Sequence, residues 1–290
     1  MRSSTLPAQN PWQAELGIQY STQEEFMLEL YQFELSHFCE KIRLILDYKG
    51  LPYRKIEVTP GLGQLDVYRL SGQRQVPILK DGNEVIADST AIADYLEKKY
   101  PERPIIPESP KLRGLTLLIE QWADESLAIN GRKCMVDGLG KDPAFRRAFL
   151  PSTTPDFLKD LLGSVPSELF GALELGVGLT PDAVKTATDA AKRDLTSLCF
   201  MLMEQPYLVT DTPTLADFAV AGLSMYLKFP EGSYLDVPEA LKGKGVPGIA
   251  DVGAFEPFFD WRDRLYMNFR KAGTTSPASS GGGPTSINIE

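Results

Sequence analysis

Residues 30–43 have the sequence LYQFELSHFCEKIR, which predicts a strand, a short loop and the first turns of a helix. The loop places Ser36, His37 and Cys39 at the N-terminus of that helix. Free backbone N–H groups and the helix dipole favour a thiolate or another anion at such an end. Ser36 and Cys39 also have the spacing of a C-x-x-C redox pair in which serine replaces the first cysteine. The sequence therefore predicts sulfur chemistry at this turn.

The segments around this turn predict a small α/β domain. Strand and helix patterns alternate along it, with strands at 26–33, 53–59, 76–79 and 84–87 and helices at 38–49, 65–70 and 88–100. Gly50 is placed to end the first helix, and the sequence KDGN at 80–83 is typical of a hairpin turn. The order βαβ, α, ββα predicts a mixed four-stranded sheet flanked by helices.

A proline-rich segment at 101–110 is the expected domain boundary, because repeated prolines resist both helix and sheet. The chain then divides into a polar arm (1–25), the α/β domain (26–100), the linker (101–110), an all-helical domain (111–272) and a disordered tail (273–290). Within the helical domain, 131–181 is predicted to be an irregular insertion. Thr214 and Asp217 have the spacing of a capping box, which is a structural role.

Composition argues against several classes of function. The 290 residues carry a net charge of −9, so we expect neither nucleic acid nor an anionic membrane as a partner. Cys39, Cys134 and Cys199 are too few and scattered for a disulfide framework and match no zinc spacing. With only one histidine as well, we expect no metal. The N-terminus shows no leader pattern and no apolar run is long enough to cross a membrane, so a cytoplasmic location is expected.

Two further segments carry candidate ligand-binding residues. Pro77 cannot donate to a sheet ladder, and at a strand start it indicates a special turn such as a cis peptide bond. That turn would direct the backbone N–H and C=O of Val76 outward, ready to pair with an extended, peptide-like ligand. Asp88 or Ser89 caps the helix that follows the hairpin. A carboxylate can be held there by the hydroxyl and the free N–H groups, and Asp88 can accept from an ammonium.

Together these segments resemble the cytosolic glutathione S-transferase superfamily. The resembling stretches follow the family's order, SHFCEKIR at 36–43, QVPIL at 75–79, DSTAIADYL at 88–96 and YLVTDTPTLADF at 207–218. The resemblance implies an α/β thioredoxin-like domain followed by an all-α helical bundle domain. It also implies a homodimer, with glutathione as cosubstrate and an electrophilic small molecule as second substrate.

The resemblance assigns roles to the ligand-binding candidates. Val76, held beside Pro77, would pair with the cysteinyl backbone of glutathione. Asp88 and Ser89 would hold the γ-glutamyl end. Members of the family often hold the glycine carboxylate with a basic or amide side chain near the second strand, and here the candidates are Gln64 and Arg74.

Ser36 stands where the family places its thiol-activating Ser, Tyr or Cys. Lowering a thiol pKa by two units takes roughly 2.7 kcal/mol, within reach of one charge-assisted hydrogen bond at a helix N-terminus. The leading hypothesis is therefore conjugation of glutathione to an electrophile, or cleavage of a substrate by glutathione attack. Cys39 is the alternative catalytic residue, for glutathione-dependent thiol–disulfide chemistry, although a buried inert thiol is the simpler interpretation.

Two other interpretations stay open. His37 stands where related motifs usually have proline, and we interpret it as a partly exposed loop residue rather than a pH-sensitive ligand contact. A third hypothesis is a non-catalytic, glutathione-transferase-like module that binds a protein partner through 131–181. Its motivation is the weak candidate site for the glycine carboxylate.

Overall fold

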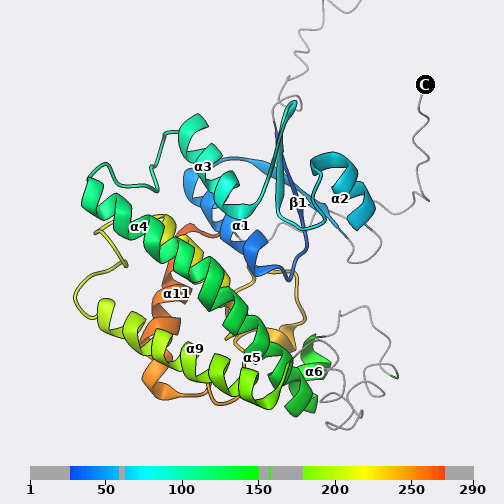
Figure 1. Ribbon diagram of the computed structural model, residues 1–290, viewed down its shortest axis with the longest axis vertical. Coiled ribbons are helices and arrows are strands. Elements are labelled where there is room, and N and C mark those ends of the chain that lie inside the picture. The colour runs from blue at the N-terminus through cyan, green and yellow to red at the C-terminus, as the bar shows by residue number, and fades with distance from the viewer. Residues whose placement is uncertain (1–26, 59–62, 150–156, 158–178, 272–290) are drawn as a thin grey trace, which may run out of the picture.

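The computed structural model describes residues 27–58, 63–149, 157 and 179–271. A mixed sheet with its helices lies against a larger group of helices, and α1 runs between the two (Figure 1). The predicted arm at 1–25, the tail from 273 and most of 150–178 lie outside the described residues. Within the described part, no helix combines the length and the apolar character that a membrane span requires.

The sheet has four strands in the order β2-β1-β3-β4. Its strands are β1 (Leu28–Gln32), β2 (Tyr53–Glu57), β3 (Ile78–Asp81) and β4 (Glu84–Ala87). β2 is parallel to β1, whereas β3 is antiparallel to both β1 and β4. This confirms the predicted mixed four-stranded sheet. β1 ends at Gln32, one residue before the predicted end, because the chain turns at 33–36. β3 has the predicted length but begins two residues later, because Pro77 lacks the N–H that a ladder needs.

Three helices accompany the sheet, α1 (His37–Lys49), α2 (Gln64–Ser71) and α3 (Ser89–Lys99). Gly50 ends α1 with a φ of 74°, in the left-handed region, and its N–H donates to Asp47, as the sequence predicts. Nearly every residue of α1 is buried, because the sheet covers one side and the helical unit the other. The N-terminus of α1 therefore opens at the junction of the two units.

The helical unit begins with one long helical run. It consists of α4 (Pro110–Trp122), a π-helical turn (Ala123–Leu127) and α5 (Ala128–Lys141), and α6 (Pro143–Phe149) comes directly after it. The prediction of irregular structure from residue 131 is wrong for 131–149. Gly131 and Gly138 lie in close packing contacts, where an added Cβ would be 3.7 Å from Leu227 and 3.4 Å from Pro247. Tertiary packing therefore outweighs the low helix propensity of glycine.

The rest of the unit is also helical. Its elements are α9 (Pro181–Met201), α10 (Leu215–Leu223), short 3-10 turns at Ser224–Tyr226, Glu239–Leu241 and Gly253–Phe255, and α11 (Glu256–Phe269). The predicted capping box opens α10, with Asp217 accepting from the Thr214 N–H at 2.7 Å. Asp217 also accepts from the Leu208 N–H at 2.7 Å, which ties the preceding loop to the helix.

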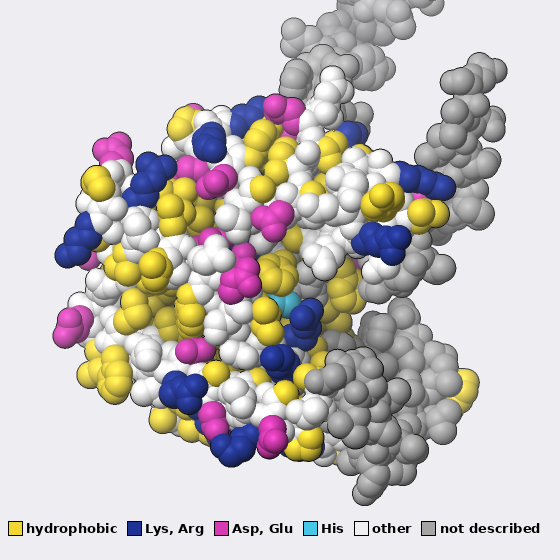
Figure 2. All heavy atoms as spheres, in the orientation of Figure 1, with side chains coloured by type: hydrophobic (Ala, Val, Ile, Leu, Met, Phe, Trp, Pro, Cys, Tyr) yellow, Lys and Arg dark blue, Asp and Glu magenta, His cyan; other side chains and the backbone are white. Residues whose placement is uncertain are grey.

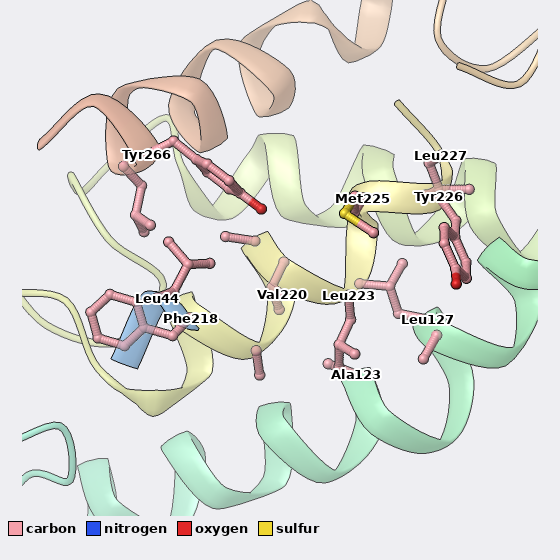
Figure 3. Close-up of a cluster of buried hydrophobic side chains, with 14 of the residues drawn as sticks. Leu44, Ala123, Leu127, Phe218, Val220, Leu223, Met225, Tyr226, Leu227 and Tyr266 are labelled. Atoms are coloured by element: carbon pink, nitrogen blue, oxygen red, sulfur yellow. The ribbon is translucent and has the colours of Figure 1, made fainter. Parts of the chain in front are cut away.

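A single apolar core joins the two units. Figure 3 shows Leu44 of α1 beside Phe218 and Val220 of α10, together with Ala123 of the π-turn. α10 is completely buried, and a Cβ added at Gly222 would lie 2.7 Å from the backbone nitrogen of Lys41. This glycine lets the two helices touch backbone to backbone, and so fixes how the helical unit meets the start of α1.

The predicted linker is anchored to this core. Residues 101–109 contain no helix or strand, as expected from the prolines, and Pro110 is the first residue of α4. Ile105 is buried, and its carbonyl accepts from the Leu215 N–H at 2.7 Å. The segment is therefore packed against the start of α10 rather than standing free as a spacer.

Candidate functional site

The strand register gathers the predicted site segments at one end of the sheet. Ile78, the first residue of β3, lies opposite Tyr31 of β1 and opposite Ala87 of β4. β1 therefore runs into the Ser36 turn at the same end where β3 begins and where β4 runs into Asp88. Segments that are about fifty residues apart in the sequence become neighbours for this reason.

Ser36 is the N-cap of α1. Its Oγ accepts from the Cys39 N–H at 3.3 Å, and its own N–H donates to the Phe33 carbonyl at 2.9 Å. The side chain is half-buried at the junction of the units. A hydroxyl that accepts in this way can still donate its own hydrogen, so Ser36 can stabilise an anion beside the free N–H groups of the helix end.

Cys39 lies in the core instead. Its side chain is fully buried, and burial raises the pKa of the thiol, although the nearby Arg43 charge and the Ser36 hydroxyl oppose this effect. A neutral, inaccessible thiol is a poor nucleophile. The geometry thus supports the inert interpretation of Cys39 and weighs against its catalytic alternative.

His37 differs from its prediction as a partly exposed loop residue. It is the first residue of α1, is only 4% exposed, and packs its ring on Phe38 and on Tyr226, with centroids 4.5 and 4.2 Å away. Burial, together with the positive charge of Arg132, lowers the pKa of the imidazole to about 3. Tyr226 lies far away in the sequence, so no local pattern reveals this contact.

The imidazole lies next to charged side chains at the surface. Figure 2 shows it as a small cyan area, among yellow hydrophobic and dark blue basic side chains. Because His37 is the only histidine in the chain, this area identifies the Ser36 turn in the view.

The predicted backbone-binding segment has the expected peptide geometry. The Val76–Pro77 bond is cis, with Val76 half-buried and Pro77 buried. The two candidates for a glycine carboxylate, Gln64 at the start of α2 and Arg74 before β3, are both exposed. The Arg74 guanidinium lies 5.7 Å from the ring centroid of Tyr68.

Asp88 and Ser89 occupy different environments. Asp88 is exposed, has a φ of 81°, and caps α3 by accepting from the N–H groups of Thr90 and Ala91 at 2.9 and 3.0 Å. Ser89 is 3% exposed, and its Oγ lies 3.4 Å from Lys41 Nζ. Of the two capping candidates, Asp88 makes the cap, while the Ser89 hydroxyl faces the interior.

Ser89 faces a charged cluster that sequence analysis missed. Lys41 forms ion pairs with Glu120 at 2.6 Å and with Asp124 at 2.9 Å, and the Thr90 hydroxyl donates to Glu120 at 2.6 Å. Burial raises the pKa of Asp124, while Lys41 opposes this. Two carboxylates thus face one lysine below the capped end of α3. Only the folded chain brings α1, α3 and the π-turn together, so the sequence pattern gives no signal for the cluster.

A second buried network lies deeper along α1. Glu40 accepts from Arg43 and from Arg270, the latter at 3.0 Å, and Arg270 also donates to Asp47 at 2.6 Å. Burial alone would raise the pKa of Glu40, but the charges of Arg270 and Arg43 hold it below its usual range. Among the described residues, no cluster of three or more His, Cys, Asp or Glu side chains is placed to hold a metal ion.

The segments that form this site match a known protein family. Residues 30–104 match the family model described as the N-terminal domain of glutathione S-transferase. This segment of the chain therefore belongs to the N-terminal domain family of glutathione S-transferase. The matched segment contains the sheet, the Ser36 turn, the cis peptide and the capped helix α3. The predicted superfamily, and the predicted thioredoxin-like fold followed by helices, are both confirmed.

Relatives with similar sequences match this chain over only part of their own length. A glutathione S-transferase from Triticum aestivum is 37% identical over 90 residues, which are 31% of this chain and 42% of the relative. A stringent starvation protein A homologue from Haemophilus ducreyi is 28% identical over 128 residues, 44% of this chain and 58% of the relative. The chain therefore spans less than two thirds of the length of these relatives.

Similarity to solved structures extends over both units. The crystal structure of the β-etherase LigF from Sphingobium sp. strain SYK-6 has a TM-score of 0.60 to this chain and 20% sequence identity. The superposition covers 83% of this chain and 95% of that one. At this level of identity the similarity shows a shared fold of sheet domain and helical unit.

Proposed function

We propose that the protein is a glutathione transferase in which Ser36 activates the thiol of glutathione for attack on an electrophilic small molecule. The observation that carries the proposal is the position of Ser36, a half-buried hydroxyl that caps α1 at the sheet end shared with the cis Val76–Pro77 peptide. A hydroxyl and a helix N-terminus together favour the thiolate over the thiol. The superfamily assignment supports glutathione as the cosubstrate.

The rest of the site fits an extended tripeptide. The backbone of Val76, next to the cis bond, would pair with the cysteinyl residue, and the end of α3 at Asp88 and Ser89 would receive the γ-glutamyl group. The glycine carboxylate would be held by Gln64 or Arg74, both of which are exposed.

The proposed chemistry is a substitution at an electrophilic carbon. The thiolate sulfur forms the new C–S bond, and the leaving group departs with the electron pair of the broken bond. Conjugation and cleavage of a substrate are two outcomes of this same step. The fold shared with a protein named as a β-etherase keeps the cleavage outcome among those to assay.

The test combines binding with two substitutions. Calorimetric titration should show glutathione binding, and a panel of electrophiles should reveal turnover. Ser36→Ala should lower kcat at least tenfold and raise the apparent pKa of bound glutathione, whereas Cys39→Ala should leave both nearly unchanged. If conjugation survives Ser36→Ala and reduction of a disulfide is lost with Cys39→Ala, thiol–disulfide chemistry through Cys39 replaces the proposal.

A non-catalytic, protein-binding module is the second candidate. Two observations favour it, the exposure of both Gln64 and Arg74 and the match to a relative whose name describes no transferase. Failure to bind glutathione at millimolar concentration would support this candidate over the enzyme. A homodimer and a cytoplasmic location are further proposals drawn from the superfamily, and light scattering checks the first.

A further inference from the structure

His37 has hydrogen-bonding capacity that the fold leaves unused. Its Nδ1 is buried without a partner, and neither ring nitrogen makes a hydrogen bond among the described residues. The ring is neutral at physiological pH, so one nitrogen donates and the other accepts. Buried polar atoms normally have partners, and one without a partner lowers stability. Nδ1 is enclosed by protein, so a bound molecule would reach the imidazole through its other nitrogen, Nε2.

Tyr226 brings a second unused polar group to the same place. Its ring packs on His37, and within the described chain no residue accepts from its hydroxyl. Burial raises the pKa of this phenol to about 12, and the nearby Cys39 thiol contributes to the shift. The hydroxyl therefore stays protonated and is available as a hydrogen-bond donor. Figure 3 shows Tyr226 at one end of the apolar cluster, next to Leu227.

Arg132 adds a positive charge to this pair. It lies on α5, is exposed, and forms no ion pair with any carboxylate in the described ranges. Its charge lowers the pKa of His37 and opposes the upward shift of Tyr226, so it acts on both rings. Arg132 follows Gly131, where an added Cβ would lie 3.9 Å from Tyr226, so its backbone lies close to that residue. A guanidinium there, without a carboxylate partner among the described residues, favours a flat molecule with an anionic group.

The fold holds the backbone segments that carry these three residues close together. A Cβ at Gly131 would lie 3.7 Å from Leu227 and 3.9 Å from Tyr226, so α5 packs closely on the turn that carries the tyrosine. The backbone contact between Gly222 and Lys41 sets that turn against α1 in the same way. The relative placement of α1, α5 and the turn that carries Tyr226 is therefore set by backbone packing.

We propose that His37, Tyr226 and Arg132 form the subsite for the second substrate, and that it takes flat, conjugated electrophiles that bear an anionic substituent. This inference rests on the proposed transferase function. Tyr226 donates to the oxygen on which negative charge develops, His37 makes a second hydrogen bond, and Arg132 pairs with the anionic substituent. None of these three side chains is assigned to glutathione itself.

Aromatic substitution illustrates the step. When the glutathione thiolate attacks the chlorinated carbon of a chlorodinitrobenzene, the C–S bond forms and negative charge moves onto the nitro oxygens. The ring then expels chloride with the electron pair of the C–Cl bond. A hydrogen bond from Tyr226 to a nitro oxygen is strongest at the intermediate stage, so it should accelerate the reaction rather than tighten substrate binding.

The test uses two matched electrophiles. One is a chlorodinitrobenzene with a nitro group on each side of the chlorine, and the other carries in addition a carboxylate para to the chlorine. Tyr226→Phe should lower kcat for both at least fivefold, with the Kd of glutathione unchanged. Arg132→Gln should raise KM at least fivefold for the carboxylate only, and His37→Phe should lower kcat/KM for both. Tyr207→Phe is the control, since this half-buried tyrosine lies outside the subsite.

A spectroscopic readout complements the kinetics. With isotope-labelled histidine, the chain gives the imidazole signals of His37 alone, and these should shift when the carboxylated conjugate binds. The subsite would be overturned, but not the proposed transferase function, if Tyr226→Phe and Arg132→Gln left the kinetics unchanged, the imidazole signals did not shift and glutathione still bound. Loss of glutathione binding by the unsubstituted protein would instead overturn the proposed function and the subsite that rests on it.

Discussion

Arg270 and Glu40 form a fully buried ion pair, with 3.0 Å between Nε and Oε1. Arg270 comes directly after α11, and Glu40 lies in the first turn of α1, so the pair joins the last described helix to the helix that carries Ser36. Asp47 completes the pairing from the far end of α1. The position of the catalytic candidate is therefore coupled to the C-terminal part of the chain.

Removing the guanidinium of Arg270 should make the folded protein less stable. Arg270→Met leaves the buried Asp47 carboxylate without its partner and Glu40 with Arg43 alone, so the free energy of unfolding should fall by about 3–5 kcal/mol. Urea denaturation measures it. Arg54→Met is the matched control, because Arg54 is exposed and pairs with Glu29 at the surface, where the loss should stay below about 1 kcal/mol. Equal losses in the two variants would refute the role given to burial.

His37 should titrate far below an ordinary histidine. Its pKa falls from 6.5 to about 3 on folding because burial disfavours the charged ring. The unfolded chain therefore takes up the proton first. The contribution of His37 to stability is fully present above pH 6.5, and it falls by about 1.4 kcal/mol per pH unit between pH 6.5 and about 3.

Nuclear magnetic resonance of the single imidazole measures this pKa directly, and His37→Phe should flatten the acid side of the stability profile. A His37 signal that titrates near its ordinary value would show that the ring is solvated.

The contact between α10 and α1 should tolerate no side chain at Gly222. In Gly222→Ala the new Cβ meets the Lys41 backbone, which cannot move aside as a flexible side chain would, so stability should fall by about 1–3 kcal/mol. Gly114→Ala is the control, because a Cβ there meets nothing within 4 Å and alanine is the better helix former. Thermal melting should separate the two variants in opposite directions.

The three cysteines should differ in reactivity. Cys199 is half-buried, whereas Cys39 and Cys134 are buried, and burial raises the pKa of all three thiols. A thiol reagent combined with mass spectrometry should label Cys199 first and the other two only after denaturant is added. Rapid labelling of Cys39 in the folded protein would instead support its alternative redox role.

Local signals in the sequence predicted much of the sheet domain. Gly50 marks the end of α1, Pro77 marks the special turn before β3, and the hairpin at 80–83 sets the register of β3 and β4. Each of these features depends on a few neighbouring residues, which is why a pattern reveals it. Together they place Ser36, Val76 and Asp88 at one end of the sheet.

The features that escaped prediction all depend on residues far apart in the chain. The burial of His37 comes from Tyr226, and the inward orientation of the Ser89 hydroxyl accompanies its contacts with Lys41 and Asp124. The helix at 131–141 contains three glycines, whose low propensity indicates irregular structure, whereas packing against later segments makes it helical. Long-range packing leaves no periodic trace in the sequence.

The π-turn between α4 and α5 also affects how this chain is aligned with its relatives. The Ala128 N–H donates to the Ala123 carbonyl, five residues back instead of four, so the turn accommodates one residue more than an α-turn. Each added residue rotates the remainder of the helix by about 100°. An alignment with a relative that has an uninterrupted helix must therefore carry a one-residue gap at 123–127. With the gap elsewhere, equivalences for α5, including that of Arg132, would fall on the wrong face of the helix.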